Sequence, residues 1–211
     1  MVLIKNTHCA KVIDRNRVLL GTDDGLYCAE LAKDEFVRIA DKRVSDIRLC
    51  LDVDIIVIIS GNRKTVRLFP ISAAISGHYD QEPPKLEETR GCYNIATGKK
   101  SRKTVIKKLF IVSGLYKHGQ VALLAVAKPK VVLVYEMFPS TELRTSLPRY
   151  RKVKEIPSDV HVQFLEVFHD RVCIGTETGV TLHSLQGAPN LPLLNTQNNN
   201  HPLYQVQICL N

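Results

Sequence analysis

Apolar and polar residues alternate along most of the chain, in short segments separated by turn-forming residues. The segment RVLLGTDDGLYCAEL, residues 17–31, contains an apolar run, the turn sequence GTDDG and a second alternating run. Period-two alternation is typical of a half-buried strand, so this segment predicts a β-hairpin. Gly25 follows Asp24 at the point where hairpin loops usually require a residue with positive φ.

A related segment, RVCIGTETGVTLHSL, occupies residues 171–185. Arg, Val, Gly, Thr, Gly and the final Leu recur at the same offsets in both segments. Hairpin geometry constrains these very positions, so convergence on a common hairpin is one explanation. Duplication of one structural unit is the other, and it is the one we favour.

Two weaker hairpin patterns lie between these segments, at residues 54–71 and 120–137. Further candidate strands precede the hairpins, in SDIRLCL, VIKKLFIVSG and VHVQFLEVF. In the first of them, Ile47, Leu49 and Leu51 are expected to point to one side. Helical periodicity is almost absent, and only FPISAAISG is expected to hold a short helical turn.

The repeated strand pattern predicts an all-β fold of about four units with three or four strands each, typical of a β-propeller. A β-sandwich is the competing architecture, and the recurrence of one hairpin at long separation favours the propeller. Residues 204–210 resemble the first strand of a fifth unit, after which the sequence stops. We therefore expect residues 1–211 to form one incomplete propeller, a piece of a longer polypeptide, with exposed loops at residues 77–91 and 186–202.

Composition narrows the class of protein. No stretch approaches the ~20 apolar residues that a membrane helix needs, and the opening MVLIKNTHC is too short for a signal peptide. The six cysteines contain no C-x-x-C pair. They are expected to be reduced thiols in a cytoplasmic protein, and neither a metal nor a cofactor is predicted.

Lys and Arg exceed Asp and Glu by eight charges, which favours an acidic partner. The positive charges concentrate in two runs, GKKSRKTVIKK and LPRYRKVKE. A solvated surface is the simple interpretation, and contact with an acidic protein or an anionic membrane is the functional one. Few aromatic residues are present for base stacking, and no nucleic acid is expected. The candidate contact residues are Lys99, Lys100, Arg102, Lys103, Lys107, Lys108, Arg149, Arg151, Lys152 and Lys154.

Two short motifs invite a catalytic interpretation, and neither supports it. The adjacent Asp23 and Asp24 suit local turn hydrogen bonding better than a metal or an acid–base pair, because they do not converge. In FHDRVC, His169, Asp170 and Cys173 lie close together, yet a Cys–His nucleophile also needs an orienting group and an oxyanion site. Cys173 is predicted to be a core cysteine. The chain also lacks the motifs of a protein kinase, so no catalytic residue is predicted.

Several blocks in series resemble the citron homology (CNH) domain, as found in citron kinase, the myotonic-dystrophy-related Cdc42-binding kinases and germinal-centre kinases. They are VLLGTDDGLYCAEL, RIADKRVSDIRL, IIVIISGNRKTVRLFP, KLEETRGC and RVCIGTETGVTLHSLQG, in the family's order. The similarity runs from about Cys9 to Leu194. The SLQG sequence at residues 184–187 favours the branch of citron and the Cdc42-binding kinases.

This resemblance implies a WD-repeat-like β-propeller that serves as a non-catalytic regulatory or scaffolding module of a Ser/Thr kinase-type signalling protein. It further implies protein–protein interaction with small GTPases of the Rho and Ras families and a role in actin-cytoskeleton signalling, alongside the rest of a parent kinase chain. The alternative is a peripheral module recruited to anionic lipid by the basic residues. The expected location is the cytoplasm, with membrane or cytoskeleton association.

Overall fold

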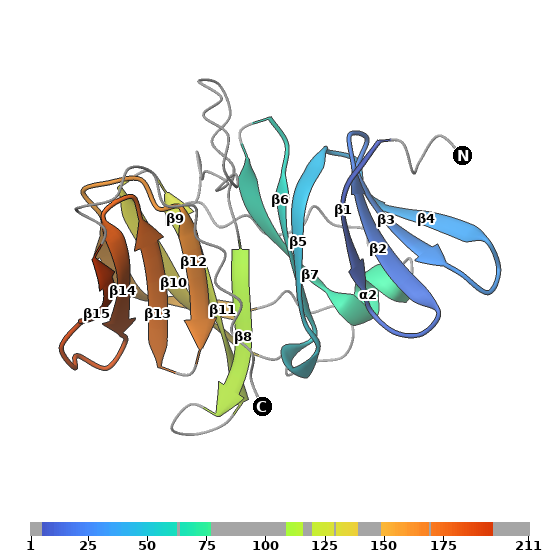
Figure 1. The fold of residues 1–211 in the computed structure, drawn as a ribbon. Coiled ribbons are helices and arrows are strands. Elements are labelled where there is room, and N and C mark those ends of the chain that lie inside the picture. Colours follow the sequence, from blue (N-terminus) through green and yellow to red (C-terminus); the bar gives the residue numbers. More distant parts are fainter. Residues whose placement is uncertain are drawn as a thin grey trace.

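The computed structural model describes residues 6–62, 64–76, 109–115, 120–128, 130–138, 149–168 and 170–195. These residues form four antiparallel sheets, which we call blades 1 to 4 in chain order (Figure 1). The strands are β1 (Thr7–Val12), β2 (Arg17–Thr22), β3 (Leu26–Glu30) and β4 (Glu35–Ala40) in blade 1; β5 (Val44–Cys50), β6 (Ile55–Ser60) and β7 (Thr65–Pro70) in blade 2; β8 (Leu109–Leu115), β9 (Gln120–Lys128), β10 (Val131–Phe138) and β11 (Arg149–Pro157) in blade 3; β12 (Phe164–Phe168), β13 (Arg171–Thr176), β14 (Gly179–Ser184) and β15 (Leu191–Asn195) in blade 4.

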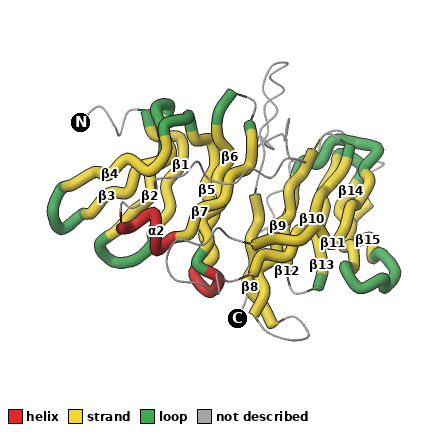
Figure 2. Tube along the Cα trace, turned by 180° about the vertical axis from the view of Figure 1, so that it is seen from behind, coloured by secondary structure: helices red, strands yellow, loops and turns green. Residues whose placement is uncertain are grey.

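Each blade is an up-and-down meander whose strands pair in sequence order. The first strands of successive blades contact one another, β1 with β5, β5 with β8 and β8 with β12. Seen from behind, the sheets follow one another in a row with the first strands towards the middle (Figure 2). This is the arrangement of an incomplete β-propeller rather than of a two-layer sandwich, so the predicted fold class is confirmed.

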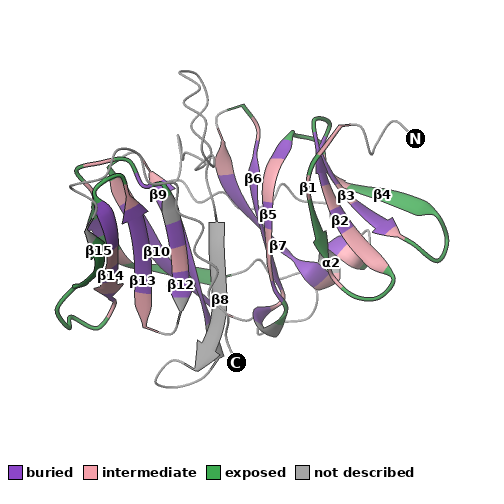
Figure 3. Ribbon diagram, viewed as in Figure 1, coloured by how far each residue is buried: buried purple, intermediate pink, exposed green. Residues whose placement is uncertain are grey.

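The core consists of three apolar clusters, each between two successive blades. All six residues of β6 are buried, because both faces of this middle strand are covered. The sequence IIVIIS therefore reads as a continuous apolar run rather than an alternation. Exposed positions gather on the outer strands β4 and β15, while the middle strands are largely buried (Figure 3).

The two copies of the repeated segment occupy equivalent places, as the second and third strands of blades 1 and 4. In blade 1 the amide of Leu31 donates to the carbonyl of Asn16 at 2.8 Å, and in blade 4 the amide of Leu185 donates to the carbonyl of Asp170 at 2.7 Å. These two bonds are equivalent, 154 residues apart in both donor and acceptor. The repeat is therefore structural, as predicted.

The hairpin turns are closed by a threonine and a glycine. Thr22 Oγ1 donates to the carbonyl of Gly25 at 3.1 Å and accepts the amides of Asp24 and Gly25. Gly25 has φ +156°, and a Cβ there would lie 1.9 Å from the carbonyl oxygen of Ala40 on β4. The predicted need for glycine at this position is confirmed, and the close approach of β4 explains it.

Several expectations about individual segments have definite outcomes. The short helical turn is found as α2 (Ile71–Ser76). Part of the predicted loop at residues 186–202 is wrong, because Leu191–Asn195 forms β15. Pro192 is tolerated there since an outer strand need not donate on its free side. The prediction that Leu51 belongs to the same strand as Ile47 and Leu49 is also wrong. Leu51 lies in a 3₁₀ turn, η1 (Leu51–Val53), after the end of β5, and its side chain is 60% exposed.

The predicted loop at residues 77–91 and the predicted fifth-unit strand at residues 204–210 lie outside the described residues. Within the described part of the chain, no helix is long and apolar enough to cross a membrane.

Candidate functional site

The basic residues predicted to contact a partner divide into two groups. Lys99, Lys100, Arg102, Lys103, Lys107 and Lys108 lie outside the described residues. Arg149, Arg151, Lys152 and Lys154 all lie on β11, the outermost strand of blade 3. The structure thus places the second basic run on a β-strand at the edge of blade 3.

The strand β11 presents a long exposed edge. Residues Arg149 to Val153 are all exposed, and β10 is the one described strand with which β11 pairs. The pairing register shifts between Val134 and Tyr135, which leaves Val153 without a register partner. Such a bulge changes the face on which the following side chains lie.

The register assigns the four basic residues to the two faces of blade 3. Arg151 pairs with Glu136, and Lys154 pairs with Val134 beyond the bulge. Both lie on the face towards blade 4, because the neighbouring Ile156 and Val134 belong to the cluster between blades 3 and 4. Lys152 pairs with Tyr135, whose side chain belongs to the opposite cluster, between blades 2 and 3.

Arg151 has a structural partner that the sequence analysis missed. Its guanidinium donates to Oε2 of Glu136 through Nη2 and, at 3.1 Å, through Nε. Glu136 is 2% exposed, whereas the Arg151 side chain is 66% exposed and also covers the Phe138 ring at 5.9 Å. A buried carboxylate requires a cation, so much of the charge of Arg151 is balanced within the blade. In the sequence, the feature that could have indicated this ion pair is the isolated Glu in the apolar segment VVLVYEMF, which precedes the basic run.

Lys154 joins two blades. Its Nζ donates to the carbonyl of Ser184 at the end of β14. Burial, together with the nearby charge of Lys154, lowers the pKa of His183, the residue before Ser184. Lys154 therefore contributes to the packing of blade 3 on blade 4 as well as to the surface charge.

Lys152 and Tyr150 complete the exposed edge. Lys152 Nζ lies 2.6 Å from Oε1 of Glu155, and this hydrogen bond lowers the pKa of the Glu155 carboxyl. The Tyr150 ring packs edge-to-face on the Tyr135 ring with centroids 6.0 Å apart. The edge thus combines an aromatic side chain with arginine side chains, and both residue types are enriched at protein-binding surfaces.

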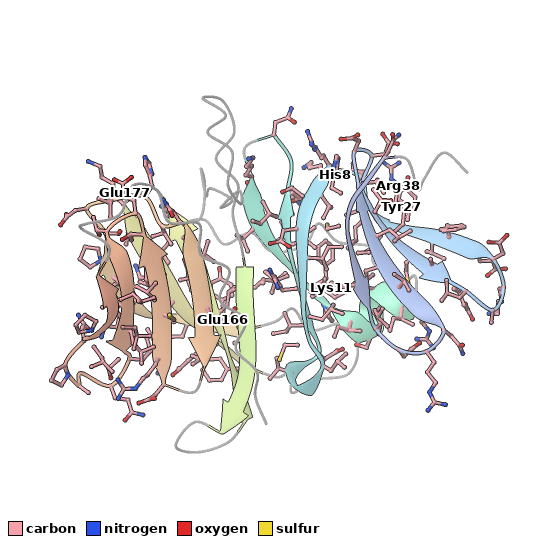
Figure 4. All side chains as sticks on the ribbon, in the orientation of Figure 1. His8, Lys11, Tyr27, Arg38, Glu166 and Glu177 are labelled. Atoms are coloured by element: carbon pink, nitrogen blue, oxygen red, sulfur yellow. The ribbon has the colours of Figure 1, made fainter. Side chains whose placement is uncertain are left out.

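The Asp-containing turn of blade 1 forms a separate polar cluster. Asp23 Oδ1 lies 2.7 Å from His8 Nε2 and 3.3 Å from Arg43 Nε, and the hydrogen bond to His8 lowers the pKa of Asp23. His8 and Glu177, beside the equivalent turn of blade 4, lie at the same end of the sheets (Figure 4). Among the described residues, no group of three His, Cys, Asp or Glu side chains is placed to hold a metal ion. The Asp23 carboxylate therefore pairs with residues outside its own turn, where local turn hydrogen bonding was expected.

Cys173 is a core residue, as predicted. It is 3% exposed, and burial together with Glu166 raises its pKa to about 11. A nucleophilic cysteine needs a lowered pKa, so this environment opposes the thiolate. His169 lies outside the described residues.

Comparison with known proteins identifies the family. The sequence model of the CNH domain matches residues 14–210. Human (Homo sapiens) serine/threonine-protein kinase MRCK alpha is 34% identical over 202 residues, which are 95% of this chain and 10% of the kinase. Serine/threonine-protein kinase MRCK beta of Mus musculus is 34% identical over 195 residues, 92% of this chain and 10% of the kinase.

A solved structure supports the same fold. The AfRom2 CNH domain superposes with a TM-score of 0.61 at 16% identity, covering 90% of this chain and 55% of that chain. The chain spans about a tenth of the length of the kinases it matches and about half of the solved domain. With four successive blades and a family match over most of its length, this chain belongs to the CNH domain family.

Proposed function

We propose that this chain is a non-catalytic regulatory module that binds an acidic protein surface through the exposed edge of β11, with small GTPases of the Rho and Ras families as the leading candidates. The kinase activity of the relatives is assigned to parts of those proteins outside the matched tenth. Cytoplasmic signalling to the actin cytoskeleton is the setting that this assignment implies.

The observation that carries the proposal is the exposure of β11 from Arg149 to Val153 on an ordered blade. A rigid frame lowers the entropy lost when side chains are ordered on binding. Basic groups at such an edge attract an acidic partner and accelerate its association. Arg149 and Lys152 are the candidates tested first, because both are exposed on β11.

The test measures binding of purified Rho- and Ras-family GTPases, loaded with GDP or a non-hydrolysable GTP analogue, at low and high salt. The double variant Arg149→Glu with Lys152→Glu is expected to weaken binding about tenfold or more. Lys11→Glu with Lys33→Glu reverses the same number of charges on blade 1 and serves as the matched control. Equal losses in both variants would contradict a role for β11.

A second variant addresses the longer basic run. Reversing Lys99, Lys100, Arg102 and Lys103 is expected to weaken binding and reduce its salt dependence. Sedimentation with anionic and neutral liposomes then separates the two kinds of partner. Binding that follows lipid charge and ignores the nucleotide state of a GTPase would overturn the protein-partner proposal in favour of a membrane surface.

A further inference from the structure

The turn between β9 and β10 carries two lysines that the site on β11 does not include. Lys128 is the last residue of β9 and is half-buried, and Lys130 precedes β10 and is exposed. The amide of Ser158 donates to the carbonyl of Lys130 at 2.9 Å. The register agrees, since Val131 pairs with Lys128 on one side and with Pro157 on the other. The two turn lysines therefore lie next to the C-terminal end of β11.

Lys128 shares one face of blade 3 with part of β11. Alternate residues of β9 belong to the cluster between blades 2 and 3, and Lys128 continues that series. Lys152 and Glu155 pair with Tyr135 and Leu133, whose side chains belong to the same cluster. In the register, Glu155 lies between the rows of Lys152 and Lys128. The hydrogen bond from Lys152 lowers the pKa of the Glu155 carboxyl, and the nearby charge of Lys128 lowers it further.

Basic side chains thus follow the outer side of blade 3 from one end to the other. They are Arg149, Arg151, Lys152 and Lys154 on β11, and Lys128 and Lys130 at the turn. Since β11 has nine residues, at about 3.3 Å per residue the row is roughly 30 Å long. Within the described residues of blade 3, Glu155 is the one exposed carboxylate, because Glu136 is buried. The row therefore suits an acidic partner of similar length.

The edge of β11 has three features that oppose the addition of another strand. The bulge leaves Val153 without a register partner. Lysine side chains line the strand, and its last residue, Pro157, has no amide hydrogen to donate. Natural proteins use bulges, lysines and prolines to protect the edges of sheets from pairing. A partner is therefore expected to contact the side chains of β11 rather than its backbone.

Glu155 restricts the chemistry of the partner. Its side chain is 54% exposed and lies among the lysines of the row. A phosphodiester backbone or an anionic lipid surface is negative throughout, so this carboxylate repels it. A protein surface places carboxylates opposite the cations and a neutral or basic residue opposite Glu155. A helix of about 20 residues is about 30 Å long, which matches the row.

We propose that the acidic partner lies along the whole outer side of blade 3, contacts Lys128 and Lys130 together with β11, and presents a helix with carboxylates on one face. Arg149 and Lys130 contact opposite ends of this helix. Its acidic residues recur at intervals of three or four positions, which keeps them on one side. The inference rests on the proposed function, to which it adds two contact residues and the form of the partner.

The test uses the 211-residue chain and a fluorescent helical peptide of about 20 residues with glutamates along one face. Fluorescence anisotropy at low salt gives the dissociation constant. Lys128→Glu with Lys130→Glu is expected to raise it about fivefold or more. Lys11→Glu with Lys33→Glu, which reverses the same number of charges on blade 1, is expected to raise it less than about twofold. Equal losses in the two variants would overturn the inference, because binding would then depend on net charge alone.

The variant Arg149→Glu with Lys152→Glu separates this inference from the proposed function. It is expected to weaken binding of the peptide at least as much as the variant of the turn lysines. Loss in this variant alone would leave the proposed function in place and overturn the extension to the turn. No loss in either variant would overturn both.

Two further measurements address folding and the form of the partner. Circular dichroism identifies a variant that has not folded, and Lys130→Glu alone, at an exposed position, then replaces the double variant. The same method follows the peptide, which is expected to stay helical when bound, and a change from helix to strand would contradict binding through side chains. A DNA duplex and phosphatidylserine vesicles serve as phosphate-bearing probes. Tighter binding of either probe than of the peptide, through the same turn lysines, would overturn the choice of a protein partner.

Discussion

Blades 1 and 4 carry the same hairpin in different surroundings. The two copies share the Thr–Gly turn bond and the backbone bond that joins the ends of the hairpin. They differ in their packing among the described residues: Leu19 is 0% exposed within the cluster between blades 1 and 2, and its equivalent Cys173, 3% exposed, belongs to a small cluster of described blade 4 residues. The comparison shows that the repeated residues determine the hairpin, while the neighbouring sheet determines how much each side chain contributes to stability.

The largest expected effect tests this difference at the equivalent pair. Leu19→Ala is expected to lower the free energy of unfolding by about 3 kcal/mol, because it opens a cavity between two blades. Cys173→Ala is expected to cost about 1 kcal/mol, since a smaller side chain is removed from a smaller cluster. Urea unfolding at one fixed protein concentration measures both. Equal losses of unfolding free energy in the two variants would mean that the neighbouring sheet does not determine how much the side chain at this position contributes to stability.

The turn glycine provides a second test, at the first copy of the hairpin. Gly25→Ala is expected to cost about 2–4 kcal/mol, because the new Cβ would overlap the backbone carbonyl of Ala40 and β4 would have to move. Gly61 is a matched control with φ +71°, where an added Cβ would meet no atom within 4 Å. Gly61→Ala is expected to cost about 1 kcal/mol, from backbone conformation alone. Thermal and urea unfolding of both variants give the comparison, and a smaller loss at Gly25 than at Gly61 would contradict it.

The threonine of the turn is expected to matter more in blade 1 than in blade 4. Thr22 is 1% exposed and its hydroxyl makes three hydrogen bonds to turn backbone, so Thr22→Val is expected to cost about 1–2 kcal/mol. Thr176 is less buried, and its hydroxyl bonds to Gly179 and Thr178. Thr176→Val is expected to cost about 0.5 kcal/mol. The urea midpoints of the two variants decide the order.

The smallest expected effect concerns the pair that Asp23 forms with His8 at the turn of blade 1. His8 and Arg43 lower the pKa of Asp23, so the ionised carboxylate contributes to stability at pH values above its ordinary pKa of 3.8. That contribution is expected to disappear as the pH falls through the lower pKa of the folded state. Asp23→Asn should therefore lower the urea midpoint slightly at pH 7 and have no effect at the acid end of the series.

The matched control for this pH series is Asp24→Asn, which removes the same charge from the adjacent residue. The Arg38 guanidinium donates a hydrogen bond to the backbone carbonyl of Asp24, not to its side chain. The substitution therefore leaves that hydrogen bond in place. A pH-dependent difference between wild type and Asp24→Asn as large as that for Asp23→Asn would contradict the assignment to the pair with His8.

Some parts of the fold were predictable because they depend on neighbours in sequence. The alternation in residues 17–31 and the glycine at position 25 determine a hairpin locally, and both are found. The strand β15 was missed because Pro192 and the surrounding Pro and Asn residues are typical of a loop, whereas pairing with β14 outweighs that preference. Leu51 was misplaced because alternation does not show where a strand ends.

Of the candidate site, only the residue types could be predicted from the sequence. The run LPRYRKVKE contains four positively charged residues. Its surroundings follow from long-range pairing: Glu136 meets Arg151 through the register of β10 and β11, and Ser184 meets Lys154 across two blades. No local pattern contains these pairs, because the residues lie 15 and 30 positions apart in the chain.

The strands, their turns and the family follow from the amino-acid sequence, because turn chemistry and apolar alternation act over a few residues. The packing of the sheets, in contrast, sets which face each strand presents to another blade, and therefore which apolar surfaces are buried and which remain exposed. Burial depends on sheets that are remote in sequence, and the same fifteen-residue motif accordingly packs on different neighbours in blade 1 and in blade 4.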